Sequence, residues 1–113
     1  MGTNYYGVER KFAMHRNIIH IGKSSMGWKF LFQGYQDYEL EWNKPHININ
    51  SLEDWKEFLS NTEEYGILDE YDKEISYEDF FKLVEKKQEE NNPEDFRYNA
   101  NINGYRFSYN DFS

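Results

Sequence analysis

The sequence has no cysteine and only two prolines in 113 residues. Without cysteine it can form neither a disulfide framework nor a thiolate metal site. No apolar run approaches the ~20 residues that a membrane-spanning helix needs, and the N-terminus lacks the apolar core of a signal peptide. We therefore expect a soluble protein located in the cytoplasm, with no membrane contact.

Aliphatic residues are few, whereas Trp, Tyr and Phe make up 19% of the chain. A chain of 113 residues is long enough to bury the core of one domain without the help of a metal or a disulfide. Aromatic rings can build such a core because each buries a large area, provided that the tyrosine hydroxyls reach water or a partner. We predict a single domain over residues 1–113, with residues 91–113 forming either a peripheral hairpin or a loosely packed tail.

The formal net charge is −8, and the acidic residues are concentrated in one region. Residues 1–35 carry five basic side chains and one acid, whereas residues 53–95 carry sixteen acids and five lysines, a net charge of −11. This balance argues against general DNA or RNA binding, because phosphate contact is mostly electrostatic. It is compatible with electrostatic steering toward a basic protein surface, and equally with a role in solubility alone.

Two segments have the pattern of short amphipathic helices. Ser51-Leu52-Glu53-Asp54 is close to a capping box and precedes apolar residues at helical spacing, and Ser76-Tyr77-Glu78-Asp79 repeats this opening. The first helix is expected to end near Asn61 or Gly66, and the second to fade out before Pro93.

Strand-like patterns occur at Asn17–Ile21, Trp28–Gln33, Tyr38–Trp42, Ile67–Tyr71, Ala100–Ile102 and Tyr105–Phe107. Tyr38–Trp42 could pair with Trp28–Gln33 across Gly34–Asp37. The dipeptide Asn103-Gly104 predicts a two-residue hairpin between the last two strands. These elements predict an α+β fold, in which a small antiparallel sheet carries two short helices packed on one face.

The densest group of ligand-type side chains lies around Gly22-Lys23-Ser24-Ser25, which we interpret as a turn between two strands. Gly22-Lys23-Ser24 resembles the last three residues of a P-loop. That motif also needs a glycine at position 17, where this chain has Asn. A looser anion site is one alternative, and a tight polar turn is the other. The predicted small-ligand residues are Tyr5, Tyr6, His20, Lys23, Ser24, Ser25 and Trp28.

Catalytic and metal motifs are missing from the sequence. There is no cysteine nucleophile and no Gly-x-Ser-x-Gly elbow. The three histidines, His15, His20 and His46, have no close spacing typical of metal ligands. We predict no catalytic residues, no metal site and no cofactor. A hydrolase that uses His20 and a carboxylate remains a third alternative, behind the two binding functions described below.

The acidic region and the tyrosines together suggest a recognition surface. The predicted protein-contact residues are Asp69, Glu70, Asp72 and Glu74, for which a simple solvated face is the alternative. Tyrosine is favoured at recognition surfaces, and Tyr5, Tyr6, Tyr35, Tyr38, Tyr105 and Tyr109 occupy loop-prone or edge-like segments. We expect the majority of these six to shield the core.

Four motifs occur in an order that resembles a family of small uncharacterised bacteriophage and prophage proteins. They are the opening Met1–Tyr6, the block His20–Ser25 followed by Gly27 and Trp28, the helix start Ser51–Lys56, and Leu68–Tyr71. The resemblance covers residues 1–85, and its specific part is the MGTNYY and HIGKSS-x-GW motifs. Family members often carry a Cys-x-x-Cys pair between these two motifs, which suggests zinc, whereas residues 10–16 of this chain contain no cysteine.

The resemblance implies a phage accessory protein that acts on a host protein, with anti-phage defence proteins among the possible targets. The leading hypothesis is therefore a non-enzymatic binding protein that inhibits or redirects a host protein in the host cytoplasm through an acidic, tyrosine-rich surface. The alternative is a protein that sequesters a nucleotide-like or phosphorylated small molecule with the residues around Lys23 and Trp28.

Overall fold

The computed structural model describes residues 2–9, 18–25, 29–39, 46–89, 100–102 and 104–109. Within these residues, seven strands form one sheet in the order β7-β6-β1-β2-β3-β9-β8. All neighbours are antiparallel except β3 and β9, which are parallel. The strands of this sheet are β1 (Gly2–Glu9), β2 (Ile18–Ser25), β3 (Leu31–Gln33), β6 (Tyr65–Asp69), β7 (Glu74–Ile75), β8 (Ala100–Ile102) and β9 (Tyr105–Ser108).

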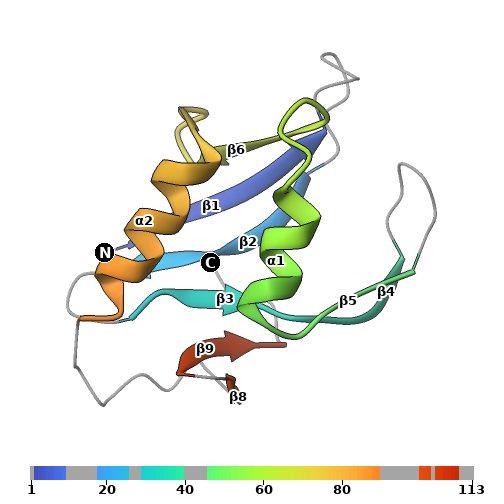
Figure 1. Ribbon diagram of the computed structural model, residues 1–113, viewed down its shortest axis with the longest axis vertical. Coiled ribbons are helices and arrows are strands. Elements are labelled where there is room, and N and C mark those ends of the chain that lie inside the picture. The colour runs from blue at the N-terminus through green and yellow to red at the C-terminus, as the bar shows by residue number, and fades with distance from the viewer. Residues whose placement is uncertain are drawn as a thin grey trace.

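Helices α1 (Leu52–Leu59) and α2 (Tyr77–Lys87) both cover the same face of the sheet (Figure 1). The predicted α+β fold, with two helices on one face of a mostly antiparallel sheet, is confirmed. Both predicted caps are present: Ser51 Oγ accepts a hydrogen bond from the Asp54 amide at 3.1 Å, and Ser76 Oγ accepts one from the Asp79 amide at 3.2 Å. Each bond satisfies an amide that the first turn would otherwise leave unpaired.

The core lies between the helices and the sheet and consists largely of aromatic rings. Phe30 is fully buried, with its ring centroid 4.7 Å from that of Phe32 and 5.5 Å from that of Phe80 on α2. Trp55 of α1 is also fully buried, and its Nε1 donates to the Gln33 carbonyl at 3.0 Å. The ring stacking supplies contact area, and this bond gives the buried indole N–H a partner.

The prediction that Tyr38–Trp42 pairs with Trp28–Gln33 is wrong for Tyr38 and Glu39, which pair elsewhere, and Trp28 and residues 40–42 lie outside the described residues. The chain passes from β3 through Gly34 into β4 (Tyr35–Glu39) without reversing, because the Gly34 amide donates to the Ser108 carbonyl at 2.8 Å and continues the contact with β9. Strand β4 pairs instead with β5 (His46–Ile49), and the two form a separate antiparallel pair.

The predicted hairpin at Asn103-Gly104 is confirmed, since β8 and β9 pair antiparallel with Ile102 opposite Tyr105. Strand β9 lies inside the sheet, between β3 and β8, and Phe107 is fully buried. The Tyr105 hydroxyl donates to Glu85 Oε1 on α2 at 2.5 Å. The C-terminal strand is thus connected both to the sheet and to the helical layer.

Candidate functional site

The Gly22-Lys23-Ser24-Ser25 segment is not a turn. It forms the second half of strand β2, with Gly2, Thr3 and Asn4 of β1 opposite Ser25, Ser24 and Lys23. Gly22 and Lys23 also pair with Phe32 and Leu31 of β3. Successive amides of an extended strand point to opposite edges. The amides of Ser24 and Ser25 therefore cannot converge on one anion, and the expected turn is corrected to a strand between two partners.

The predicted small-ligand residues are divided between the two faces of the sheet. Tyr5 faces the helices: it is 8% exposed, and its ring centroid lies 5.4 Å from that of Phe80. Tyr6 follows Tyr5 in the strand and so faces the opposite side, where its ring centroid lies 5.3 Å from that of His20. Trp28 lies outside the described residues. The structure thus brings Tyr6 and His20 together and separates Tyr5 from them.

His20 belongs to a polar row that crosses three strands on the face away from the helices. Its Nε2 lies 3.0 Å from Asn4 Oδ1, and its Nδ1 lies 3.4 Å from Gln33 Oε1. Gln33 is 2% exposed, and its Nε2 donates to the Ser108 carbonyl at 3.1 Å. These contacts hold the imidazole in place within the sheet, which favours a positioned strand histidine over a ligand-binding one.

Two lysine side chains, those of Lys29 and Lys87, form hydrogen bonds between the end of α2 and the segments next to the predicted small-ligand residues. Lys87 Nζ donates to the Ser25 carbonyl at 2.7 Å, and Lys29 Nζ donates to the Gln88 carbonyl at 2.5 Å. The Ser25 side chain is itself buried, with 5% of its surface exposed. This end of β2 therefore serves to join the sheet to the end of α2.

The predicted protein-contact residues lie along the β6–β7 hairpin, and Asp69 shapes its turn. Asp69 Oδ1 accepts hydrogen bonds from the amides of Tyr71 and Lys73, at 2.8 and 2.9 Å. Asp72 has a φ of 63°, in the left-handed region that Asp tolerates better than most residues. Asp69 is thus primarily a turn former, whereas Glu70, Asp72 and Glu74 are exposed.

Beside this hairpin, on the face away from the helices, is a hollow of about 110 Å³ that we call the acidic hollow. Its apolar wall consists of Tyr6, Val8, Ile18 and Leu68, and its acidic rim of Asp69, Glu70 and Asp72. Glu70 Oε1 accepts a hydrogen bond from the Asn4 amide at 2.8 Å, which holds the rim against β1. Ile18 is 55% exposed, and the adjacent hairpin carries Tyr71, which is 76% exposed.

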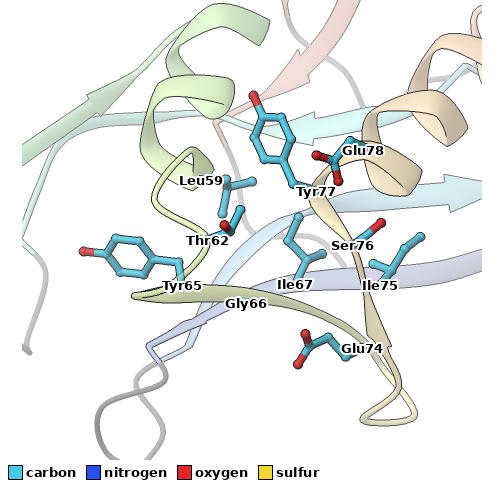
Figure 2. A pocket seen from close by; sticks show the side chains of 10 residues that line it. All are labelled: Leu59, Thr62, Tyr65, Gly66, Ile67, Glu74, Ile75, Ser76, Tyr77 and Glu78. Atoms are coloured by element: carbon cyan, nitrogen blue, oxygen red, sulfur yellow. The ribbon is translucent and has the colours of Figure 1, made fainter.

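A second and larger hollow, of about 270 Å³, lies on the helical side of the same hairpin (Figure 2). We call it the helix-end groove, because it separates the end of α1 from the start of α2 above β6 and β7. Its lining residues are Leu59, Thr62, Tyr65, Gly66, Ile67, Glu74, Ile75, Ser76, Tyr77 and Glu78. Of the four predicted protein-contact residues, only Glu74 lines this groove.

The sequence did not single out Tyr65, Tyr77 or Glu78 as site residues. Tyr77, Phe80, Phe81 and Val84 follow helical spacing, so Tyr77 belongs to the apolar side of α2 and Glu78 does not. Tyr77 is half-buried, Glu78 is exposed, and both line the groove. Burial raises the pKa of Tyr77, and the negative charge of Glu78 raises it further. The helical pattern marked these positions, but only the approach of the α1–β6 loop turns them into the wall of a groove.

Within the described residues, no three His, Asp or Glu side chains are grouped closely enough to hold a metal ion. The His46 side chain and the whole of His15 lie outside the part of the chain that can be assessed. Of the helices described, none is both long and apolar enough to cross a membrane. Both hollows described above combine apolar area with carboxylates among their lining residues.

No protein-family model, curated protein or solved structure matches this chain. The resemblance to small phage proteins accordingly stays a prediction made from the sequence motifs.

Proposed function

We propose that this chain is a non-enzymatic accessory protein that binds a basic surface of another protein through the acidic hollow. The observation that carries the proposal is the composition of that hollow, which has an apolar wall and three carboxylates at its rim. The exposed Tyr71 lies in the chain between two residues of that rim, Glu70 and Asp72. Apolar contact supplies affinity, and opposite charge supplies orientation and a fast encounter. The net charge of −8 favours the same class of partner.

The biological setting of the proposal comes from the sequence resemblance. A phage-encoded protein of this kind would inhibit or redirect a protein in the host cytoplasm, with defence proteins among the targets. The acidic rim supports a target with a basic face, such as one that itself contacts nucleic acid. Exposed tyrosine is suited to anchor such a contact, because it offers a large ring and a hydroxyl with few rotatable bonds.

The test is capture of partners from a bacterial host lysate by the immobilised chain, followed by titration of the purified partner. We expect Tyr71→Ala combined with Asp72→Asn to weaken binding by about 10-fold or more, because a contact anchor contributes on the order of 2 kcal/mol. Asp72→Asn removes the charge and retains a residue that tolerates positive φ. Asp69 is left unchanged because it forms the turn.

Glu57→Gln provides the matched control, since Glu57 is exposed on α1, on the other side of the sheet. This variant should retain the partner at wild-type strength, and raised salt should weaken the wild-type complex. A partner that binds the Tyr71/Asp72 variant as tightly as the wild type would contradict the proposal, as would the absence of any captured protein.

The alternative function, sequestration of a phosphorylated small molecule, gains no specific support. Strand β2 directs the side chains of Lys23 and Ser24 to opposite faces, and Tyr5 is part of the core. A compact anion site would require these groups to converge.

A further inference from the structure

The floor of the acidic hollow is made of side chains from three neighbouring strands. Tyr6 and Val8 are two residues apart on β1 and so project from the same face. Leu68 of β6 is opposite Tyr6, and Ile18 of β2 is opposite Val8, which places all four side chains on that face. Val8 and Leu68 are buried, whereas Ile18 is 55% exposed. The hollow therefore has a continuous apolar floor with an open aliphatic side.

The size of the hollow suits the end of one long side chain. Its volume is about 110 Å³, well below the roughly 300 Å³ at which pockets for small-molecule ligands begin. It is also several times the ~30 Å³ that one water molecule occupies in the liquid. A side chain of a protein partner thus fits this space better than a whole nucleotide-like ligand does.

The carboxylates that give the hollow its charge are those of Glu70 and Asp72, which both line it and are both exposed. Asp69 contributes less, because its Oδ1 accepts hydrogen bonds from two backbone amides of the turn. Burial raises the pKa of Tyr5, which faces the helices, and the charge of Asp69 raises it further. The charge of Asp69 therefore acts on the helical side, and a cation at the rim would meet Glu70 and Asp72 first.

The seven residues that line the hollow, all in the described part of the chain, include no lysine, arginine or histidine. Two lysines from the surrounding strands and hairpin are directed elsewhere. Glu74 is opposite Leu68 and shares its face, so the preceding Lys73 projects toward the helical face. Lys23 of β2 reaches toward the start of β1, since a Cβ atom at Gly2 would lie 2.6 Å from its Cε. Neither lysine cancels the negative charge of the rim.

We propose that the acidic hollow receives the side chain of an arginine that projects from the partner protein. The aliphatic stem packs on the floor, against Val8, Ile18 and Leu68, and the guanidinium group lies at the rim beside the carboxylates of Glu70 and Asp72. This inference rests on the proposed function and deepens it by naming the side chain that the partner contributes.

Arginine suits this site better than lysine for two reasons. Glu70 Oε1 already accepts a hydrogen bond from the Asn4 amide at 2.8 Å, so its second oxygen and the separate carboxylate of Asp72 remain for the partner. The N–H donors of a guanidinium spread over a plane and can reach oxygens of more than one residue. A guanidinium is also more weakly hydrated than an ammonium and can stack on the Tyr6 ring, so it tolerates contact with the apolar floor better.

The experiment titrates the ¹⁵N-labelled chain with n-butylguanidinium, with n-pentylammonium and with the neutral n-butylurea, each separately and at neutral pH. Amide shifts are followed at Val8, Leu68 and Glu70, which line the hollow. We expect saturable shifts with n-butylguanidinium and several-fold weaker binding of n-pentylammonium. n-Butylurea should also bind at least several-fold more weakly, because it has a similar shape but lacks the charge that the rim attracts.

Glu70→Gln should weaken the binding of n-butylguanidinium about twofold to fivefold, the range of a solvent-exposed ion pair. The glutamine keeps an Oε1 that can accept from the Asn4 amide, so the change removes charge and not the contact with β1. Glu63→Gln is the matched control and should leave the affinity unchanged. It removes the same charge from an exposed residue that precedes β6 and does not line the hollow.

Ile18→Ala tests the stem. It should weaken the binding of n-butylguanidinium and reduce its advantage over methylguanidinium, because the shorter probe has little stem to pack on the floor. Since Ile18 is more than half exposed, its truncation spares the core.

The assignment is overturned if the amides of the hollow do not shift, or if n-butylurea or n-pentylammonium binds as tightly as n-butylguanidinium. It is also overturned if Glu63→Gln weakens binding as much as Glu70→Gln does. These outcomes can be separated from failure of the proposed function. If partner capture depends on Tyr71 and Asp72 while n-butylguanidinium does not bind, only the arginine assignment fails. If n-butylguanidinium binds while the Tyr71/Asp72 variant retains its partner, the proposed function fails.

Discussion

Gly22 lies at the position where β2 meets both β1 and β3, and the available space there excludes a side chain. A Cβ atom at this residue would lie 2.3 Å from the Leu31 carbonyl oxygen and 2.4 Å from Phe30 Cε1. The carbonyl belongs to the backbone of the neighbouring strand, so it cannot move without disturbing the sheet. At the residue scale, Gly22 is explained by the close approach of β3 and not by a role in anion binding.

The first prediction follows from this contact. Gly22→Ala should lower the free energy of unfolding by about 3 kcal/mol, the cost of forcing an extra methyl group into a packed region. Gly7→Ala is the comparison, because its Cβ would lie 3.1 Å from Ile19 Cγ2 and 3.4 Å from Leu59 Cδ2, which are side-chain methyl groups and not backbone atoms, at distances that small shifts can relieve. Its cost should be about 1 kcal/mol or less. Urea unfolding of the two variants checks the difference, and equal costs would contradict the backbone argument.

At the scale of elements, local signals placed the helices well. The Ser-x-x-Asp openings are complete within four residues and depend on nothing else in the chain, and both predicted starts are correct. In α1 the cap has a second part, since Asp54 Oδ2 accepts a hydrogen bond from the Asn50 amide at 2.9 Å. The start of α1 is thus held by two side-chain bonds, one in each direction along the chain.

The second prediction concerns this start. Ser51→Ala should cost about 1 kcal/mol of stability, because it leaves the Asp54 amide without its acceptor, whereas Ser51→Gly should cost only a few tenths. The same pair of changes at Ser76 should give a similar difference, since the hydroxyl there has the same role. Thermal or urea unfolding measures each value, and an alanine variant as stable as its glycine counterpart would refute the assignment of these serines.

The strands were predicted less completely, because their partners are remote in sequence. Strand β1 was missed although it lies near the middle of the sheet. Its apolar positions are interrupted by glycine and by the buried polar residue Asn4, so the alternation that marks a strand is weak. Charge is visible in sequence, so the acidic residues could be named as candidates, whereas the acidic hollow that they border forms only when β1 pairs with β6.

At the scale of the whole molecule, tyrosine hydroxyls link the sheet to α2 and the residue after β9 to the segment just before α1. Tyr105 of β9 donates to Glu85 of α2, and Tyr109 Oη donates to Asn50 Oδ1 at 2.7 Å. The hydrogen bond to Glu85 raises the pKa of Tyr105 to about 12, with burial and the charges of Glu85 and Glu53 acting in the same direction. Burial also raises the pKa of Tyr109, assisted by the charge of Asp54.

These pKa shifts predict how stability depends on alkaline pH. A phenol whose pKa is higher in the folded state than in the unfolded state binds its proton more tightly when folded. Its contribution is complete below pH 10, the ordinary tyrosine value, and is lost as the pH rises from there through about 12. The free energy of unfolding should therefore fall over this interval. The slope of this fall is set by how many more protons the folded state binds than the unfolded state, and Tyr105→Phe should lower that number by up to about one.

The measurement is urea unfolding at a series of pH values from 9 to 12, followed by circular dichroism, for the wild type, Tyr105→Phe and Tyr71→Phe. Tyr71 is 76% exposed at the hairpin and serves as the matched control, because its removal deletes a phenol without breaking a link between layers. The control should retain the wild-type slope. If Tyr105→Phe also retains it, the bond to Glu85 does not hold the C-terminal strand against α2, and the connection between the last strand and the helical layer would have to depend on apolar packing, with Phe107 in the core and the ring at position 105 against it.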